Sequence, residues 1–324
     1  MKFYFSHGRT ALKYGLKYLD FKKNDKLMMP NYLCDVLLDP LKDLGIEPTY
    51  YEINDDFTVN FKSLKKNFDN KIKGIMFINF FGFEENKIKY YEFCKKKNLF
   101  IIEDNCHLLK KNFSRNNKIA DLAFYSSRKF IKKSYSGGIL EILNKKKNLN
   151  FLIKKLNKYP VSLLSVLNTF LENNFFFIKR IIKFNFFKMP DYNKINGINI
   201  DKINEDFRID DKSYLELKKF DFDKLHLKRS NNYKTWKKFC TLNSIQIINR
   251  KIQKKTIPWL LPAYITDKNL KKKLFKYGWK EGFNIISWPN LPKSLINKKT
   301  AKKWNNLICF NTDKAPVSLK TLKF

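Results

Sequence analysis

NLFIIEDNCHLLKK, residues 98–111, and DLAFYSSRKFIKKSYSGG, residues 121–138, each set a short apolar run directly before polar side chains. In the first stretch, residues 99–102 form the apolar run, Asp104 follows it, and His107 comes three residues later. A short apolar run between polar segments is typical of a strand that is buried on both faces. The stretch therefore predicts a buried strand with a carboxylate at its end.

The second stretch repeats this arrangement with a lysine in place of the acid. Residues 122–125 are apolar, and Ser126 and Lys129 follow them. An acid at one strand end and a lysine beyond another are what a pyridoxal phosphate (PLP) site needs, because the lysine forms a Schiff base and the acid keeps the pyridine nitrogen protonated. Each residue also has an ordinary interpretation, with Asp104 as a helix cap, His107 as a loop histidine and Lys129 as one of many surface lysines.

The chain favours an alternation of strands and helices to about residue 110. Apolar runs recur between helix-like segments, which is the signature of a mainly parallel α/β sheet. Ligands of such sheets bind beyond the carboxyl ends of the strands, where we expect Asp104 and Lys129. The expected strands are residues 26–29, 46–53, 72–81, 99–102, 122–125 and 138–143, and the expected helices include one that begins near Thr10 and one over residues 88–97.

The helix that begins near Thr10 offers a place for an anionic group. Gly8 and Thr10 lie at its mouth. The first backbone N–H groups of a helix lack partners within it, and its dipole is positive there, which suits a phosphate. The alternative is that Thr10 only caps the helix.

Composition limits the class of protein. With 44% hydrophobic residues the chain is expected to be globular. Its net charge of +36 suits an anionic substrate, but the lysines are spread over all segments, which argues against a specific nucleic-acid surface. The five cysteines are far apart and lack CxxC pairs, as expected for reduced thiols in the cytoplasm. The three histidines lack metal-ligand spacing, and no apolar stretch reaches the roughly 20 residues of a spanning helix, so neither a metal site nor a membrane span is expected.

Later segments set the domain organisation. Residues 144–205 have a helical apolar rhythm and predict helices packed on the core or on a second subunit, with a peripheral contact to an anionic membrane as the alternative. Residues 214–240 predict one long helix, short strands follow, and residues 313–324 are expected to be a loose tail. We therefore expect a large α/β domain over residues 1–211, with a helical insertion at 144–205, and a small α+β domain over residues 212–324.

Several motifs in this order resemble the DegT/DnrJ/EryC1/StrS family of PLP-dependent sugar aminotransferases of fold type I. The turn that binds the cofactor phosphate in that family is read here as Gly8-Arg9-Thr10-Ala11-Leu12, and a proline-containing strand end followed by a helix is read as MPNYLCDVLLDPL, residues 29–41. EDNCH, residues 103–107, is similar to a motif whose Asp pairs with the pyridinium and whose His or Gln approaches the ring hydroxyl. Ser126, the implied phosphate contact, comes before the lysine, and Gly137-Gly138 come after it.

Four features depart from the family's pattern. Arg9 interrupts the small residues of the phosphate turn, so it would contact phosphate or face solvent. Cys34 occupies the place of an aromatic or histidine ring over the cofactor, which leaves Tyr32 as the alternative stacking group. SYSGG, residues 134–138, lacks the usual acid before the glycines. Phe207-Arg208 resembles part of a segment donated by the partner subunit, so the resemblance implies a homodimer with Arg208 in contact with substrate or partner.

The resemblance implies an aminotransferase that passes an amino group, from glutamate in most relatives, to a keto-sugar. The expected acceptor is nucleotide-linked and belongs to polysaccharide or glycoconjugate synthesis. In such an enzyme Lys129 carries PLP and moves the proton as base and then acid, while Asp104 and His107 hold the ring. The alternatives are a PLP-dependent sugar dehydratase, which retention of Lys129 disfavours, a PLP-binding scaffold or regulator without turnover, and a polyanion-binding protein with inherited motifs.

Overall fold

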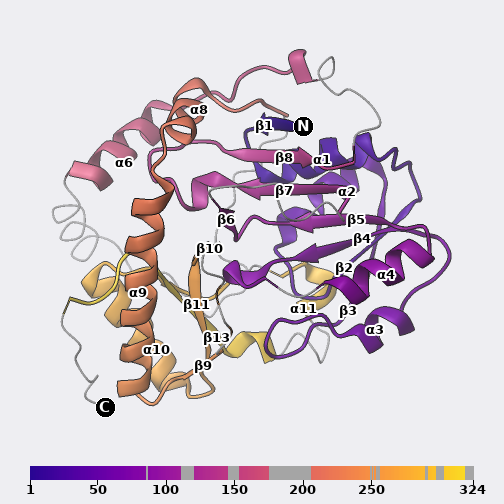
Figure 1. Ribbon diagram of the computed structural model, residues 1–324. Helices are drawn as coiled ribbons and strands as arrows, with labels where there is room; N and C mark the ends of the chain where they lie inside the picture. The colour runs from indigo at the N-terminus through magenta and orange to yellow at the C-terminus, as the bar shows by residue number, and fades with distance from the viewer. Residues whose placement is uncertain are drawn as a thin grey trace.

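The computed structural model describes residues 1–84, 87–110, 120–144, 153–174, 206–248, 250, 252, 256–288, 291–296 and 303–317. A seven-stranded sheet organises its N-terminal part, with strand order β1-β8-β7-β5-β4-β2-β3 (Figure 1). All of its strands run in one direction except β8, which is antiparallel to both neighbours. The predicted α/β class with a mainly parallel sheet is therefore confirmed. The strands are β1 (Lys2–Phe5), β2 (Lys26–Pro30), β3 (Glu47–Tyr51), β4 (Ile72–Ile78), β5 (Phe100–Asp104), β7 (Leu122–Ser126) and β8 (Gly138–Ile142).

Side chains of the central strands alternate between two apolar layers. In β4, Met76 packs into one layer, whereas Ile75 and Phe77 pack into the other. The helices α1 (Gly8–Tyr18) and α2 (Asp39–Leu44) supply residues to the layer of Met76, and α3 (Phe61–Lys66) and α4 (Ile88–Lys96) supply the opposite layer. Both faces of the sheet are thus covered, which explains why its central strands are mostly apolar before the polar residues at the end of β5.

The helix predicted over residues 214–240 is wrong in one respect, because the chain forms two helices. They are α8 (Asp211–Lys218) and α9 (Phe222–Leu242). Asp221 begins the second, since its carboxylate accepts a hydrogen bond from the backbone N–H of Lys224. A side chain that caps a helix stabilises the beginning of a helix at that residue. The Asp221 cap therefore favours a second helix over a single helix that continues through residue 221.

A second, four-stranded sheet follows α9, with strand order β12-β13-β11-β9 and antiparallel pairing throughout. The helix α10 (Lys268–Glu281) packs on it, and a short ladder joins β6 (Leu109–Lys110) to β10 (Thr256–Ile257). Tyr32 and Trp304 belong to one apolar cluster although they come from opposite ends of the chain. A domain boundary at residues 211 and 212 stays a prediction. The strands of this sheet are β9 (Gln246–Ile247), β11 (Leu260–Tyr264), β12 (Ile285–Ile286) and β13 (Leu307–Asn311).

The prediction of a loose tail over residues 313–324 is wrong for its first residues. The side chain of Asn232 donates hydrogen bonds to the carbonyls of Thr312 and Asp313, and the indole N–H of Trp236 donates to the carbonyl of Lys314. These hydrogen bonds from side chains of α9 hold the chain in place directly after β13. Residues 318–324 lie outside the described residues.

The predicted helical insertion contains α6 (Leu163–Asn174), on which Leu163, Leu164 and Phe170 are exposed. The rest of the insertion beyond residue 174 lies outside the described residues, as do residues 145–152. Within the described part of the chain, no helix has the length and apolar character needed to cross a membrane. Whether α6 meets a second subunit stays untested.

Gly138 allows the chain to pack tightly where β8 meets the start of α1. A Cβ atom at this position would fall on the backbone carbonyl of His7, well inside contact distance, and close to the backbone N of Gly8. Since both neighbours are backbone atoms, they cannot swing away as a side-chain tip could. The close approach brings the first turn of α1 to the edge of the sheet.

We expect Gly138→Ala to lower the free energy of unfolding by about 3 kcal/mol or more, because the clash forces the backbone to move. Urea unfolding of the two proteins measures the difference. Gly15→Ala is the matched control, since its Cβ would meet only leucine side-chain tips at 3.0–3.4 Å and alanine favours a helix. Equal losses in the two variants would contradict this explanation.

Candidate active site

The sheet brings Asp104 and Lys129 to the same edge. β5 ends at Asp104 and pairs in parallel with β7, whose last residue, Ser126, leads directly into the 3-10 turn Ser127–Lys129. Asp104 is only 5% exposed, and its Oδ1 accepts a hydrogen bond of 2.8 Å from the backbone N–H of Cys106. Burial raises the pKa of Asp104, and the nearby charge of Lys129 acts in the opposite direction. A buried carboxylate of this kind is stabilised by a cationic partner.

The Lys129 ammonium group is the centre of the candidate site. Its charge lowers the pKa of the Cys34 thiol in opposition to burial, which nevertheless raises that pKa to about 11. Its Nζ lies 4.5 Å from the centre of the Trp259 ring and 5.9 Å from that of Trp288. Cys34 is therefore a neutral thiol close to the lysine, while the aromatic surface comes from elsewhere in the chain.

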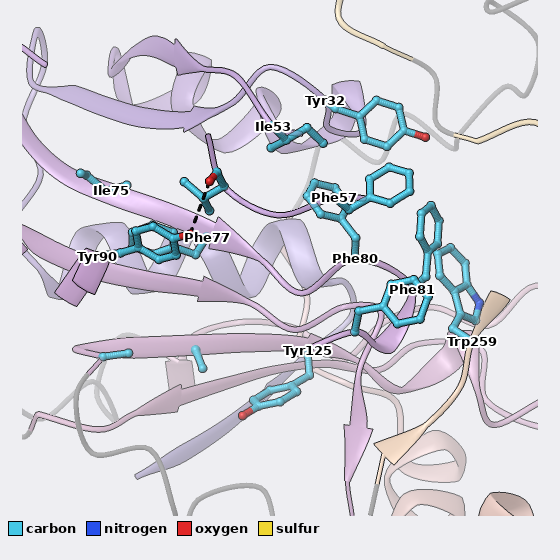
Figure 2. Close-up of a cluster of buried hydrophobic side chains, with 14 of the residues drawn as sticks. Tyr32, Ile53, Phe57, Ile75, Phe77, Phe80, Phe81, Tyr90, Tyr125 and Trp259 are labelled. Atoms are coloured by element: carbon cyan, nitrogen blue, oxygen red, sulfur yellow. Dashed lines mark hydrogen bonds between the residues drawn. The ribbon is translucent and has the colours of Figure 1, made fainter. Parts of the chain in front are cut away.

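His107 is buried among aromatic rings and is held in one orientation. Its ring centre lies 4.2 Å from that of Trp259 and 4.4 Å from that of Trp288. Burial and the charge of Lys129 lower the pKa of His107, so it is neutral. The backbone N–H of Phe81 donates to Nδ1 over 3.3 Å, which leaves the proton on Nε2. His107 thus offers one N–H donor. Figure 2 shows Phe81 and Trp259 next to each other in this aromatic cluster.

The first turn of α1 forms a backbone cradle beside these groups. A Cβ at Gly8 would lie 2.8 Å from the sulfur of Cys106, so only glycine lets α1 approach the end of β5 this closely. The N–H groups of Gly8 and Thr10 have no acceptor within the helix. Ser6, just before α1, is fully buried, and its hydroxyl has no hydrogen-bond partner. The carbonyl of Ser6 accepts from the N–H of Gly137, which brings it to the Ser127 turn. This cradle of N–H and hydroxyl groups is suited to an anion.

The other predicted site residues lie in different surroundings. Arg9 lies 4.0 Å from a carboxylate oxygen of Asp39 and is mostly buried, so it does not simply face solvent. Tyr32 is fully buried, its ring packs 4.3 Å from that of Trp304, and its hydroxyl donates to the carbonyl of Trp288. Arg208 donates from Nε to the carbonyl of Leu156 over 2.8 Å, and its backbone bridges to β1. Contact of Tyr32 or Arg208 with substrate or partner stays a prediction.

A buried polar network lies behind Asp104. Glu103 is paired with Lys87 at 3.0 Å, and both side chains are almost fully buried. Burial alone would raise the pKa of Glu103, but Lys87, the Tyr91 hydroxyl and the Asn105 amide together lower it. The Asn105 amide donates to Glu103 over 3.1 Å, so the residues on both sides of Asp104 are fixed. The network positions Asp104 through its neighbours in the chain.

Several residues of the site were not predicted from the sequence. Trp259 and Arg229 come from the second half of the chain, and Lys87 lies before α4. Arg229 is buried and donates to the backbone carbonyl of Lys129 over 3.4 Å. No local pattern marks these residues among the many lysines and aromatic residues, although an Arg on the buried side of a long helix is unusual. Among the described residues, no group of three His, Cys, Asp or Glu side chains could hold a metal ion.

Comparisons with known proteins agree with the motifs. Residues 4–136 match the DegT/DnrJ/EryC1/StrS aminotransferase family, which confirms the predicted resemblance over that part of the chain. A GDP-perosamine synthase of Escherichia coli O157:H7 is 26% identical over 100 residues, which are 31% of this chain and 28% of that protein. The match thus spans less than a third of its relative.

Solved structures share the fold over nearly the whole chain. PseC of Helicobacter pylori, an aminotransferase involved in the biosynthesis of pseudoaminic acid, has a TM-score of 0.67 at 15% identity, and the match covers 96% of this chain and 81% of that one. NtdA of Bacillus subtilis, solved with bound cofactor PMP, has a TM-score of 0.62 at 13% identity, with coverage of 96% and 68%. At this identity the likeness establishes the fold.

We expect Lys87→Met to lower the free energy of unfolding by about 3–5 kcal/mol, because it leaves Glu103 buried without its cation. Urea unfolding measures the change. In the double variant Lys87→Met/Glu103→Gln the unpaired charge is gone, so part of the loss should be recovered. A double variant less stable than Lys87→Met would contradict the role given to this ion pair.

The unfolding free energy should depend on pH through His7, the residue before α1. Burial and the charges of Arg128 and Arg9 lower the pKa of His7 from 6.5 to about 3. The unfolded chain therefore binds one more proton between these values, so stability is full above pH 6.5 and falls as the pH drops toward 3. From pH 7 to pH 5 the His7 contribution amounts to about 2 kcal/mol. In His7→Gln the loss measured by urea unfolding between these two pH values should be smaller by that amount. An unchanged pH dependence would exclude His7 as its source.

Proposed function

We propose that this chain, whose residues 4–136 match the DegT/DnrJ/EryC1/StrS aminotransferase family, is a PLP-dependent aminotransferase that acts on a sugar. The observation that carries the proposal is the meeting of a buried carboxylate, Asp104, and a lysine, Lys129, at the edge of a parallel sheet. The family match covers the segments that hold both residues. The named activities of the similar proteins support the same reaction class.

The residues present fit this cofactor. Asp104 is a buried carboxylate that a protonated ring nitrogen would stabilise, and burial raises its pKa in the absence of such a partner. The cradle of Gly8, Thr10 and the partnerless hydroxyl of Ser6 fits a phosphate, with Ser126 beside it at the end of β7. His107 donates from Nε2 and fits the ring hydroxyl. Bound PLP supplies an electron sink for the carbon that carries the amino group.

The chemical roles of the side chains follow from this arrangement. Lys129 would hold the cofactor covalently through Nζ, and its free amine would move a proton at the substrate carbon as base and then as acid. Asp104 would remain ionised against the ring nitrogen, because the protonated ring and the backbone N–H of Cys106 both stabilise its carboxylate against the effect of burial. His107 stays neutral and orients the ring. The buried aromatic cluster excludes water from the reacting atoms.

The finer assignments belong to the same proposal. The acceptor is a keto-sugar, with a nucleotide-linked sugar favoured because the Escherichia coli relative is named for a GDP-linked product and because the chain's charge of +36 attracts anionic substrates. The amino donor is glutamate and the enzyme acts as a homodimer, as the family resemblance implies, and the widely spaced cysteines favour the cytoplasm. Transamination needs a free lysine amine, so the presence of Lys129 favours transamination over dehydration.

We expect the purified protein to bind PLP and turn yellow, with an absorption band that borohydride abolishes. Lys129→Ala should lack the band, because no other group offers the covalent nitrogen at this position. Glutamate should then bleach the band of the wild-type protein as the amino group is transferred. Absorbance spectra before and after each addition measure these changes, and Lys132→Ala, which removes a lysine three positions further on, is the matched control. A wild-type protein that stays colourless with PLP would refute the proposal.

We expect Asp104→Asn to keep PLP binding but to slow amino transfer from glutamate by about 10²–10³-fold, since the electron sink loses its ionic partner. Stopped-flow absorbance of the glutamate reaction measures the rate. A coloured wild-type protein that does not react with any amino donor would favour the scaffold or regulator instead.

A further inference from the structure

The Lys129 ammonium lies over the face of an indole ring from the second half of the chain. Its Nζ is 4.5 Å from the Trp259 ring centre, within the range in which a cation is attracted by an aromatic face, and tryptophan attracts cations most strongly. Trp259 is 7% exposed, so water screens this attraction little. Trp288 lies further from the same nitrogen, at 5.9 Å. Trp259 lies outside residues 4–136.

Buried hydrogen-bond donors hold the backbones of Trp259 and Lys129 in place. The Trp259 carbonyl accepts from the Thr312 hydroxyl over 2.9 Å and from the Arg229 guanidinium over 3.5 Å. The same guanidinium donates to the Lys129 carbonyl over 3.4 Å and to the Thr312 hydroxyl over 3.1 Å. One fully buried cation on α9 thus ties the backbone of Trp259 to that of Lys129. Two segments that are far apart in the sequence are fixed relative to each other at the site.

We propose that the face of Trp259 is the docking place of the Lys129 ammonium whenever the lysine is not covalently attached, with Arg229 as the positioning residue that keeps the two together. The role of this contact in amino transfer rests on the proposed function. The contact between the Lys129 ammonium and the Trp259 ring does not depend on that function. Trp259 then belongs to the catalytic machinery, although it lies in the part of the chain that carries no recognised motif. Arg229 acts only through the two backbones that it joins.

The amino-transfer step explains why such a place is useful. The Schiff base C=N bond to Lys129 is broken, the donor's amino group remains on the cofactor carbon, the donor leaves as a 2-oxo acid, and one water molecule is consumed. Lys129 is released as an amine and takes up a proton. Trp259 stabilises that ammonium through its ring face. The indole forms no salt bridge with the lysine and is not a nucleophile that could react in its place. The indole face therefore favours the aminated side of the equilibrium.

The contact is tested by 19F NMR of the protein labelled with 5-fluorotryptophan and free of PLP. The five tryptophans give separate signals, and the signal absent from Trp259→Phe identifies residue 259. We expect Lys129→Met to shift the Trp259 signal more than the Trp288 signal. Lys212→Met is the matched control, because the Lys212 ammonium lies over the ring of Tyr135 instead. Unchanged signals elsewhere show that the variants are folded. A Trp259 signal that does not move in Lys129→Met would overturn the inference, whatever the protein's activity.

The role is tested by the equilibrium between the two absorbing forms of the PLP-loaded protein at fixed ratios of glutamate to 2-oxoglutarate. Loss of a desolvated cation–π contact corresponds to about a tenfold change in an equilibrium constant. We expect Trp259→Leu to lower the equilibrium constant for the aminated form by about tenfold, and Trp259→Phe to lower it less because a phenyl face remains. Trp259→Leu with an unchanged constant would refute the role while leaving the aminotransferase intact. A wild-type protein that fails to bleach with glutamate would refute the proposed function, and the NMR result would still stand.

Discussion

The parallel pairing of β5 with β7 is the constraint on which the site depends. Glu103 and Asp104 pair with Ala123 and Phe124, so the ends of the two strands reach the same edge. This register places a carboxylate and, a short turn later, a lysine within electrostatic reach of each other. A shift by one residue would turn Asp104 toward the opposite apolar layer and separate the pair, since successive side chains of a strand face opposite ways. Because both layers are dry, such a shift would also bury a charge among apolar side chains.

Two sets of contacts, one on each side of the sheet, hold this register. On one side, glycines at positions 8 and 138 let the first turn of α1 approach the strand ends without a side chain between them. On the other side, the ion pair of Lys87 and Glu103 anchors β5 against the segment before α4. A buried ion pair adds little net stability over an apolar pair of the same size, but it tolerates few alternative arrangements. The polar network thus contributes specificity of position more than free energy.

The sequence predicts the part of the fold that depends on local patterns. Apolar runs and the polar residues after them locate β2, β4, β5 and β7, and they predict that Asp104 and Lys129 lie at the same edge of the sheet, where the structure brings them within electrostatic reach. Contacts between distant segments leave no such pattern. The strand β13 and the anchoring of the chain after it were missed, because Trp236 and Asn232 hold that segment through side-chain hydrogen bonds from a distant helix. The break between α8 and α9 does have a local signal, the Asp221 cap, which the apolar spacing of the surrounding helix obscured.

Cys34 lies where the family resemblance implies an aromatic ring, and its surroundings involve both halves of the chain. Cys34 is small and its thiol is protonated, so it cannot supply a stacking surface or a charge. The Tyr32 ring packs against Trp304 and its hydroxyl donates to the Trp288 carbonyl, so a stacking role for Tyr32 stays a prediction. The aromatic surface at Lys129 instead comes from Trp259, which Arg229 and Thr312 fix from the second sheet. Residues 4–136 contain Asp104 and Lys129, whereas the ring over which the Lys129 ammonium lies comes from the second half of the chain, so both halves contribute to the candidate site.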